Sequence, residues 1–193
     1  MYISKITTDY RKRGDVYELH QLLWKGFADG DNARERDFLF RAERLPRKQA
    51  VILVQSVSRP CWDGVFPPSG VAVKSYAPVF KNGQVFHFLI QVSASVAKSN
   101  GPGRQPTKKP LPWEAYTPWF RKRGKTDGFE VMAAEKVNDV FVSSRKKPKL
   151  RFAGRILTGM LRISESDAFL HAYQQGIGRG RAFGFGMLSL MGS

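Results

Sequence analysis

Strand-like and helix-like segments occur twice in nearly the same order along this 193-residue chain. Alternating runs rich in β-branched and aromatic residues predict strands, whereas apolar residues three and four positions apart predict helices. The second half gives β-α-β-β-α-β, the complete order of a ferredoxin-like unit, and the first half gives the same order with a loop in place of the second helix. No internal sequence repeat accompanies this order. We therefore predict an α+β fold of tandem ferredoxin-like (RRM-like) domains with antiparallel sheets.

Each half is expected to form one domain, with limits at residues 1–83 and 84–193. The expected elements of the first domain are strands at 2–8, 36–45, 49–58 and 71–80 and a helix at 16–28. Those of the second domain are strands at 84–97, 129–143, 150–163 and 185–190 and helices at 113–123 and 166–175. Residues 98–112 are rich in glycine, proline and lysine, which predicts a flexible loop.

Local signals add detail to this outline. Asp15 and Ser164 stand before the first and last predicted helices, where a side-chain oxygen can cap free N–H groups. Asn82 and Gly83 predict a tight turn that joins the two flanking strands as a hairpin. Pro118 must kink the middle helix or shift its start, because proline has no N–H to donate.

Basic residues outnumber acidic residues, 32 against 16, so the net charge is +16 and the pI about 10.3. Hydrophobic residues still make up 42% of the chain, which is typical of a folded protein. The excess is uneven, since residues 98–163 hold 16 basic and five acidic residues. Such a surface favours a polyanionic partner, with nucleic acid as the first candidate. Anionic lipid is the weaker alternative, because proline interrupts the basic stretches and no basic amphipathic helix is predicted.

Several kinds of site find no support in the sequence. Cys61 is the single cysteine, which excludes an intramolecular disulfide and a multi-cysteine zinc site. The histidines are scattered and no strong motif of paired carboxylates occurs, so we expect no metal and no cofactor. The first ten residues lack the apolar core of a signal peptide, and no run approaches 18 apolar residues. We therefore expect a soluble, cytoplasmic protein without a membrane partner.

Tyr17 and His20 form the candidate catalytic pair. They lie three residues apart on the edge of the predicted apolar helix face, so both side chains can reach the same point. Such a pair suits RNA cleavage, because RNA supplies its own nucleophile, the 2′-OH, and needs only a proton acceptor or donor and stabilisation of the phosphate. His20 would act as general base or acid, and Tyr17 would donate a hydrogen bond or orient the phosphate. A packed aromatic edge is the alternative, and His87 and His171 are expected to be structural.

The densest basic cluster lies in the turn between the strands predicted at 129–143 and 150–163. A basic hairpin can follow phosphates along the edge of an RNA duplex, which positions the RNA without reading its sequence. A solvated turn is the alternative interpretation. The residues of this basic hairpin are Arg145, Lys146, Lys147, Lys149 and Arg151.

A glycine-rich loop precedes the last predicted strand. Glycine allows a positive φ and a close approach of the backbone to a ligand, and the neighbouring arginines point to a polyanion. The loop is not a dinucleotide fingerprint, because Arg181 and Phe183 stand where G-x-G-x-x-G requires glycine, and the order is helix, loop, strand. A simple turn into a terminal strand is the alternative. The candidate RNA-binding residues of this glycine loop are Gly176, Gly178, Arg179, Gly180, Arg181, Gly184 and Gly186.

The two ends of the chain resemble the type I-E CRISPR-associated endoribonucleases that process repeats, the CasE family of Cascade subunits. MYISK at 1–5, VYELHQ at 16–21 and Leu23-Trp24 are similar to that family's first strand and catalytic helix. QQGIG at 174–178, five further residues and GFGMLSL at 184–190 are similar to its glycine loop, G-h-G-x5-G-h-G, in which h is apolar. The middle of the chain matches mainly in element order and in the basic hairpin.

The resemblance implies a metal-independent endoribonuclease that binds the stem-loop of a CRISPR repeat. It would cut precursor CRISPR RNA at the 3′ base of the stem by 2′-OH attack and leave a 2′,3′-cyclic phosphate and a 5′-OH. It would stay bound to the mature guide RNA beside other Cascade subunits, with only indirect contact to target DNA. Tyr17 and His20 match the family's catalytic tyrosine and histidine. Lys25 matches a lysine implicated in some relatives, but on an ideal helix it lies about 140° from His20 and is left out of the catalytic set. A non-catalytic RNA-hairpin-binding subunit is the alternative function.

Overall fold

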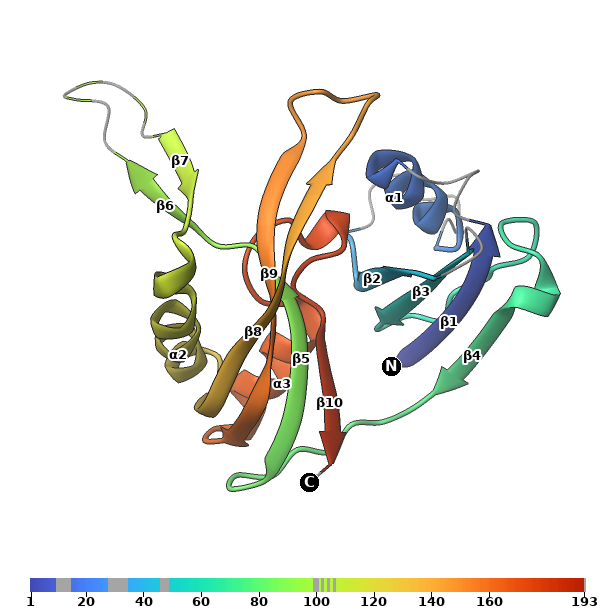
Figure 1. Cartoon of the computed structure of the whole chain (residues 1–193). Coiled ribbons are helices and arrows are strands. Elements are labelled where there is room, and N and C mark those ends of the chain that lie inside the picture. Colours follow the sequence, from blue (N-terminus) through green and yellow to red (C-terminus); the bar gives the residue numbers. More distant parts are fainter. Residues whose placement is uncertain are drawn as a thin grey trace.

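The computed structural model describes residues 1–9, 15–27, 35–45, 49–98, 101, 103, 105 and 107–192. Two four-stranded antiparallel sheets stand next to each other, and a two-stranded ribbon projects beyond the second sheet (Figure 1). None of the described helices is long and apolar enough to cross a membrane.

The first sheet comes from the N-terminal part of the chain and carries helix α1 on one face (Figure 1). Alternate residues of its third strand are buried, and Ile52 and Val54 share one hydrophobic cluster with Leu19 and Leu23 of the helix. This amphipathic packing fixes which side of the helix stays accessible. The elements are β1 (Tyr2–Asp9), α1 (Val16–Lys25), β2 (Phe38–Arg44), β3 (Gln49–Ser56) and β4 (Val71–Ser75), in the sheet order β2-β3-β1-β4.

The second sheet comes from the C-terminal part and has two helices packed against it. Phe120 and Phe169, one from each helix, are fully buried in its hydrophobic cluster. The elements are β5 (Val85–Val92), α2 (Tyr116–Thr126), β8 (Phe129–Ser143), β9 (Arg151–Ile163), α3 (Ser166–Gln175) and β10 (Leu188–Gly192), in the order β10-β5-β9-β8.

When strands are numbered within each unit, both sheets have the order 4-1-3-2 with antiparallel neighbours. In the first unit, a loop with the 3-10 turn η3 (Pro68–Gly70) replaces the second helix. The predicted tandem ferredoxin-like fold is therefore confirmed.

The predicted hairpin at Asn82 and Gly83 is wrong. Strand β4 ends at Ser75 and pairs with β1, whereas β5 pairs with β9 and β10 of the other sheet. Residues 76–84 instead carry the chain from one sheet to the other, and the Gly83 N–H donates to Ile163 O at 2.8 Å. The turn itself forms, since Asn82 and Gly83 are turn residues and the Gln84 N–H donates to Lys81 O at 3.2 Å. It does not join two paired strands, because β4 and β5 make their backbone hydrogen bonds in different sheets.

Residues 98–112 are more ordered than predicted. A two-stranded ribbon joins β6 (Ser95–Lys98) to β7 (Thr107–Pro110), so the strand predicted at 84–97 is split in two. The flexible loop was therefore predicted too long, and residues 99, 100, 102, 104 and 106 lie outside the described part.

Helix ends also differ from the predictions. Pro118 lies in the first turn of α2, after the 3-10 turn η4 (Trp113–Ala115), so it shifts the helix start and leaves no missing bond inside it. Glu165, and not Ser164, caps α3 by accepting from the N–H groups of Asp167 and Ala168. Helix α1 ends at Lys25, earlier than predicted.

Side-chain hydrogen bonds and the glycine loop join the two units. Gln55 donates to Tyr173 O at 2.7 Å, and Arg41 donates to Ser189 Oγ at 2.7 Å. The glycine loop contains the 3-10 turn η5 (Arg181–Phe183), which lies against α1 and β2. These contacts bring the C-terminal loop to the predicted catalytic helix.

Candidate active site and RNA-binding surface

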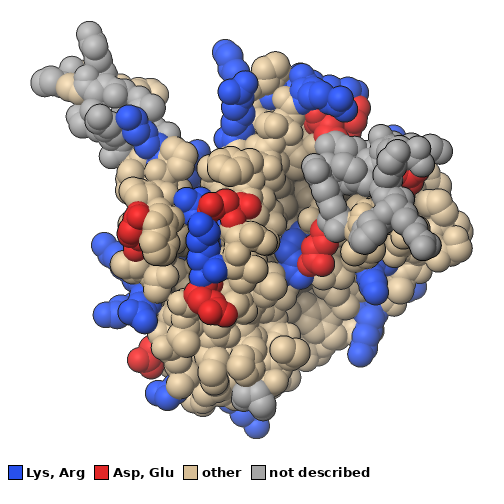
Figure 2. All heavy atoms as spheres, in the orientation of Figure 1, with Lys and Arg blue, Asp and Glu red and all other residues tan. Residues whose placement is uncertain are grey.

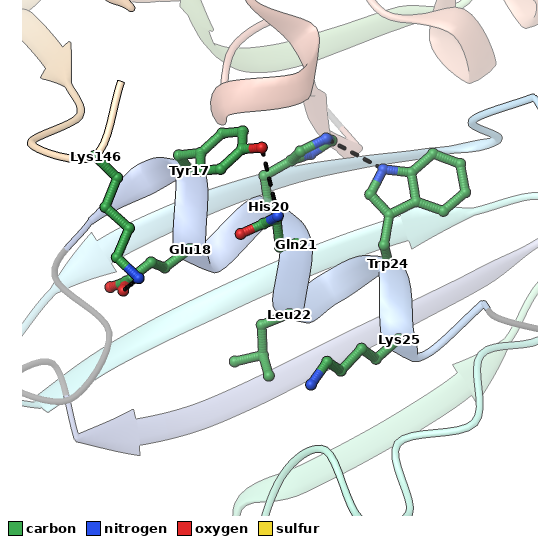
Figure 3. A pocket seen from close by; sticks show the side chains of 8 residues that line it. All are labelled: Tyr17, Glu18, His20, Gln21, Leu22, Trp24, Lys25 and Lys146. Carbon is green, nitrogen blue, oxygen red and sulfur yellow. Dashed lines mark hydrogen bonds and ion pairs between the residues drawn. The ribbon is translucent and has the colours of Figure 1, made fainter. Parts of the chain in front are cut away.

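Helix α1 presents one face to an open groove of about 810 Å³ (Figure 3). Asp15 caps the helix by accepting from the Tyr17 N–H at 2.9 Å, as predicted. Leu19 and Leu23 point into the core. The adjoining face of the helix therefore lines the groove. The groove is lined by Tyr17, Glu18, His20, Gln21, Leu22, Trp24, Lys25 and Lys146.

His20 is half-buried in an aromatic setting. Its Nε2 accepts from Trp24 Nε1 at 3.1 Å, and its ring lies 5.4 Å from the Phe183 ring of the glycine loop. The Phe38 ring is 6.5 Å away on another side. Among the described residues, His20 Nδ1 has no hydrogen-bond partner. Because Nε2 accepts a hydrogen bond, the neutral imidazole carries its proton on Nδ1, and this nitrogen is buried.

The surroundings hold the pKa of His20 below its ordinary value. Burial lowers the pKa most, and the positive charge of Arg36 lowers it further. The backbone of Ala182 opposes this shift, although it does not stand in hydrogen-bond geometry to Nδ1. A lowered pKa keeps the imidazole neutral near pH 7, which is the form that can accept a proton.

Tyr17 lines the same groove one turn earlier on the helix (Figure 3). Its hydroxyl accepts from Gln21 Nε2 at 3.4 Å, and Lys147 Nζ lies 5.4 Å from the ring centroid. A cation over the ring face is attracted to it. The structure therefore places Tyr17 and His20 at one groove, with a lysine of the basic hairpin beside the tyrosine.

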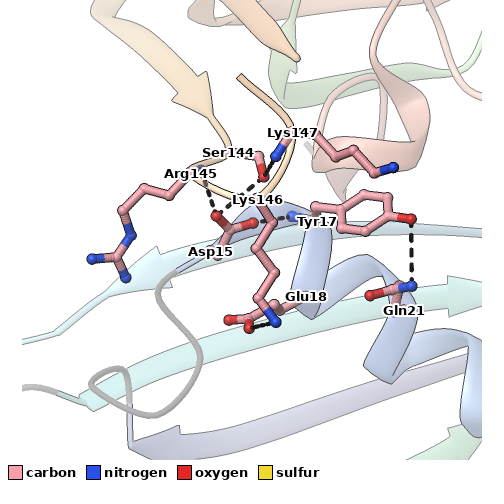
Figure 4. A network of polar contacts seen from close by, with 8 residues as sticks. All are labelled: Asp15, Tyr17, Glu18, Gln21, Ser144, Arg145, Lys146 and Lys147. Atoms are coloured by element: carbon pink, nitrogen blue, oxygen red, sulfur yellow. Dashed lines mark hydrogen bonds and ion pairs between the residues drawn. The ribbon is translucent and has the colours of Figure 1, made fainter. Parts of the chain in front are cut away.

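The basic hairpin docks onto the N-terminus of α1 through Asp15 (Figure 4). Asp15 Oδ2 accepts from Ser144 Oγ at 3.1 Å and from the Arg145 N–H at 2.7 Å. Burial raises the pKa of Asp15, but hydrogen bonds from Ser144, Arg145 and Tyr17 outweigh it, so the pKa lies below its ordinary value. The carboxylate is charged and joins the hairpin to the helix.

Four of the five basic side chains of the hairpin fall into two groups. Lys146 Nζ pairs with Glu18 Oε1 at 2.5 Å, so Lys146 and Lys147 both reach α1. Lys149 and Arg151 instead line a second pocket, together with Arg179 of the glycine loop. In Figure 2, Lys and Arg side chains project from the end of the molecule where the β8–β9 turn and α1 lie.

The loop glycines serve the shape of the loop itself. Gly176, Gly178, Gly180, Gly184 and Gly186 all have positive φ. A Cβ on Gly178 would lie 2.8 Å from Ser93 O, and one on Gly186 would lie 2.8 Å from Ile177 O. Protein packing therefore accounts for glycine at these positions, and the cationic contacts of the loop come from its arginines.

The arginines of the loop have defined partners. Arg181 donates to Gln175 O at 2.8 Å, and Arg179 donates to Ser95 Oγ at 2.7 Å. Phe183 packs against His20, so the loop contributes to the surroundings of the histidine.

Arg36 is a site residue that sequence reasoning missed. Its guanidinium donates to Phe38 O at 3.1 Å and lies 5.9 Å from the Phe38 ring. Burial lowers the pKa of Arg36 most, and the charge of Arg181 lowers it further. Arg36 itself is the cation that lowers the pKa of His20. An arginine at the start of a predicted strand carries no sequence signal for this role.

Lys25, which was left out because of its helical angle, also lines the groove of His20. The groove is wide enough to follow the helix for more than one turn, so a position about 140° away still reaches it. Across the described part of the chain, no cluster of three or more histidine, cysteine or acidic residues could hold a metal ion.

Fold and site together define a cationic tandem ferredoxin-like protein with a histidine–tyrosine groove beside a basic hairpin. A family model described as "CRISPR associated protein" matches residues 1–191, so the chain belongs to this family.

Two curated relatives are similar over nearly their whole length. The "CRISPR-associated endoribonuclease Cse3" of Thermus thermophilus is 27% identical over 98% of this chain and 99% of its own. The "CRISPR system Cascade subunit CasE" of Escherichia coli is 28% identical over 98% of each chain. A solved structure of Thermus thermophilus Cse3 bound to "an RNA representing a pre-cleavage complex" has a TM-score of 0.81, with 23% identity and 98% coverage of each chain, and that likeness concerns the fold.

Proposed function

We propose that this chain is a metal-independent endoribonuclease that cuts precursor CRISPR RNA at the 3′ base of the repeat stem. The observation that carries the proposal is the half-buried His20, with a lowered pKa, in a groove that also holds Tyr17 and borders the basic hairpin. Relatives named as a CRISPR-associated endoribonuclease and a Cascade subunit support it. The chain would remain on the mature guide RNA beside other Cascade subunits.

The 2′-OH of the nucleotide before the cut attacks the neighbouring phosphorus, and the P–O5′ bond breaks. The products are a 2′,3′-cyclic phosphate and a 5′-OH. His20 either takes the proton of the 2′-OH or gives one to the leaving oxygen. Because Nδ1 is buried, this step uses Nε2, which exchanges its hydrogen bond from Trp24 for one to the RNA. Tyr17 donates a hydrogen bond to a phosphate oxygen. Arg36 and Arg181 stabilise the extra negative charge of the pentacovalent phosphate.

The basic hairpin and the glycine loop would hold the RNA around this groove. Lys147 and Arg145 would contact backbone phosphates of the stem, whereas Lys146 is paired with Glu18. Arg179 and Arg181 extend the cationic surface on the other side of His20, and the glycines set the loop's course.

The direct test is cleavage of labelled repeat RNA in EDTA by the unaltered chain and by His20→Ala. General acid–base catalysis is worth roughly 10²- to 10⁴-fold, so His20→Ala should lose at least about 100-fold in rate. Binding should change little, because a neutral imidazole adds little to phosphate affinity. His87→Ala, on the strand β5, is the matched control and should cut normally. A collapse of binding in His20→Ala would show that His20 is structural.

A non-catalytic RNA-binding subunit is the second candidate. It is favoured by the Trp24 hydrogen bond to His20 Nε2 and by the aromatic packing of the imidazole. In that case the repeat RNA would remain bound and uncut in EDTA, with and without the His20 substitution.

A further inference from the structure

The pocket that Lys149 and Arg151 line together with the glycine loop has no role in the proposed cut. It lies where the end of β5, the base of the ribbon β6–β7, the start of β9 and the glycine loop meet. Its volume is about 310 Å³. The lining residues are Ser93, Ala94, Ser95, Pro110, Lys149, Leu150, Arg151, Phe152, Ala153, Arg179 and Phe183.

The chemistry of this pocket is cationic and aromatic. Lys149, Arg151 and Arg179 supply three positive charges, and the lining contains no acidic residue. The Phe152 ring forms part of the wall and lies 5.5 Å from the Phe183 ring. Arginine and aromatic faces together are what proteins use to hold single-stranded nucleic acid, because every base has a face that can stack.

The pocket is held in shape by the protein itself. Arg179 is fixed by its backbone N–H, which donates to Ser93 O at 2.9 Å, and by its guanidinium, which donates to Ser95 Oγ at 2.7 Å. This side-chain bond uses one of the five guanidinium donors. A Cβ on Gly180 would lie 3.1 Å from the Phe152 ring, so the glycine loop packs closely on that ring.

Phe183 connects the pocket to the candidate active site. Its ring is 5.4 Å from His20 on one side and 5.5 Å from Phe152 on the other. The aromatic wall of the pocket therefore stands one ring away from the imidazole. A strand whose phosphate lies at His20 brings a nearby nucleotide to this pocket.

Resting on the proposed function, we propose that this pocket binds one unpaired nucleotide of the repeat RNA that flanks the cut. The base stacks on Phe152, and its phosphate lies between Arg179 on one side and Lys149 and Arg151 on the other. The volume is at the lower end of small-ligand sites, about 300–1,000 Å³, so it admits a single nucleotide and excludes a duplex. An unpaired nucleotide can be splayed out into such a pocket, whereas a base inside an A-form stem cannot.

The first experiment measures single-turnover cleavage of repeat RNAs that each carry one abasic nucleotide at an unpaired position beside the cut. With the unaltered chain, one position should lower kcat/KM by roughly 5- to 150-fold, the range for stacking one base. With Phe152→Leu, the intact RNA should already be slowed, and the same abasic RNA should show little further loss. Phe141→Leu, the same change at a 79% exposed position on β8, should behave like the unaltered chain. If the abasic nucleotide lowers kcat/KM by the same factor in all three proteins, the proposed nucleotide pocket is wrong.

A second experiment uses no substituted protein, because Phe152→Leu also loosens the packing of Gly180 and the glycine loop on ring 152. RNAs with 5-iodouridine at each flanking position are irradiated in complex with the unaltered chain, and the crosslinked peptides are mapped by mass spectrometry. A crosslink to Phe152 or Phe183 from one position is expected. Crosslinks only elsewhere, or none, would overturn the proposal.

The two proposals fail in different ways. If the RNA is cut but cleavage needs no flanking base that contacts Phe152, the proposed nucleotide pocket is wrong and the proposed endoribonuclease activity stands. If the RNA stays uncut but crosslinks to Phe152, the proposed endoribonuclease activity is wrong and the proposed nucleotide pocket stands.

Discussion

Replacing Asp15 by alanine should disconnect the basic hairpin from helix α1. The carboxylate accepts from the Tyr17 N–H at 2.9 Å, from Ser144 Oγ at 3.1 Å and from the Arg145 N–H at 2.7 Å (Figure 4). Asp15 is only 3% exposed although it lies near the surface, because the hairpin turn covers it. One side chain thus holds the helix cap and the docking of the turn.

The size of the effect follows from these three bonds. Loss of a helix N-cap costs about 1 kcal/mol, and each hydrogen bond to a charged acceptor contributes roughly 1.5–3 kcal/mol. Water can reach the freed donors once the turn lifts, so we expect a loss of about 2–4 kcal/mol. For a chain of this size that lowers Tm by roughly 5–15 °C.

Thermal unfolding at neutral pH measures this change directly. Glu130→Ala is the control, since Glu130 is another carboxylate that contacts a different element, but it pairs with Arg162 at 3.7 Å on the surface. Its loss should cost under about 1 kcal/mol. In a double-mutant cycle, Asp15→Ala and Ser144→Ala should be non-additive, because they remove the same bond. Additive losses, or equal Tm shifts for Asp15→Ala and Glu130→Ala, would refute the docking role.

The same substitution has a pH signature. Because the folded pKa of Asp15 is lowered, its contribution is complete above the unfolded value, near 4, and is lost as pH falls through the lower folded value. The stability difference between the unaltered chain and Asp15→Ala should therefore be constant from about pH 5 upward and shrink in acid. A difference that grows in acid would contradict the hydrogen-bond explanation.

Further predictions concern the histidine, the hairpin and the loop. Arg36→Gln removes a charge that lowers the pKa of His20, so the His20 limb of the pH–rate profile should move to higher pH; an unmoved limb would place Arg36 away from the reaction. Alanines at the three hairpin cations 145–147 should weaken repeat RNA binding. They should also reduce the slope of log Kd against log salt concentration by the amount that about two phosphate contacts contribute. Alanines at the cations 121, 122 and 125 of α2 should change neither quantity. Gly178→Ala should cost about 2–4 kcal/mol by thermal unfolding, since its Cβ would meet Ser93 O, whereas Gly64→Ala, with positive φ and open space, should cost about 1–2 kcal/mol.

Local patterns were enough to predict the elements that carry the candidate site. The spacing of apolar residues placed Tyr17 and His20 on one edge of α1, because helix geometry fixes which positions share a face. Asp15 was predicted as the cap from its place before that helix, and the structure confirms it. The charge run and the turn signals located the basic hairpin between two strands that do pair with each other.

Other features depend on residues that are distant in sequence. The partner of β4 and the crossing at 76–84 depend on pairing between strands that are far apart in sequence, and no local signal records that pairing. The bond from Ser144 to Asp15 spans 129 positions, so neither residue alone indicates it.

The sequence by itself therefore determined the two ferredoxin-like units, the cationic character and the helix that bears the histidine, since these follow from periodicity and composition. Only the tertiary structure decided that Arg36 and the glycine loop stand beside His20, and that Lys149, Arg151 and Arg179 converge on one pocket. The physical reason is that a site charge or a pocket wall depends on distances in space, which are fixed when two sheets pack, and not on spacing along one element.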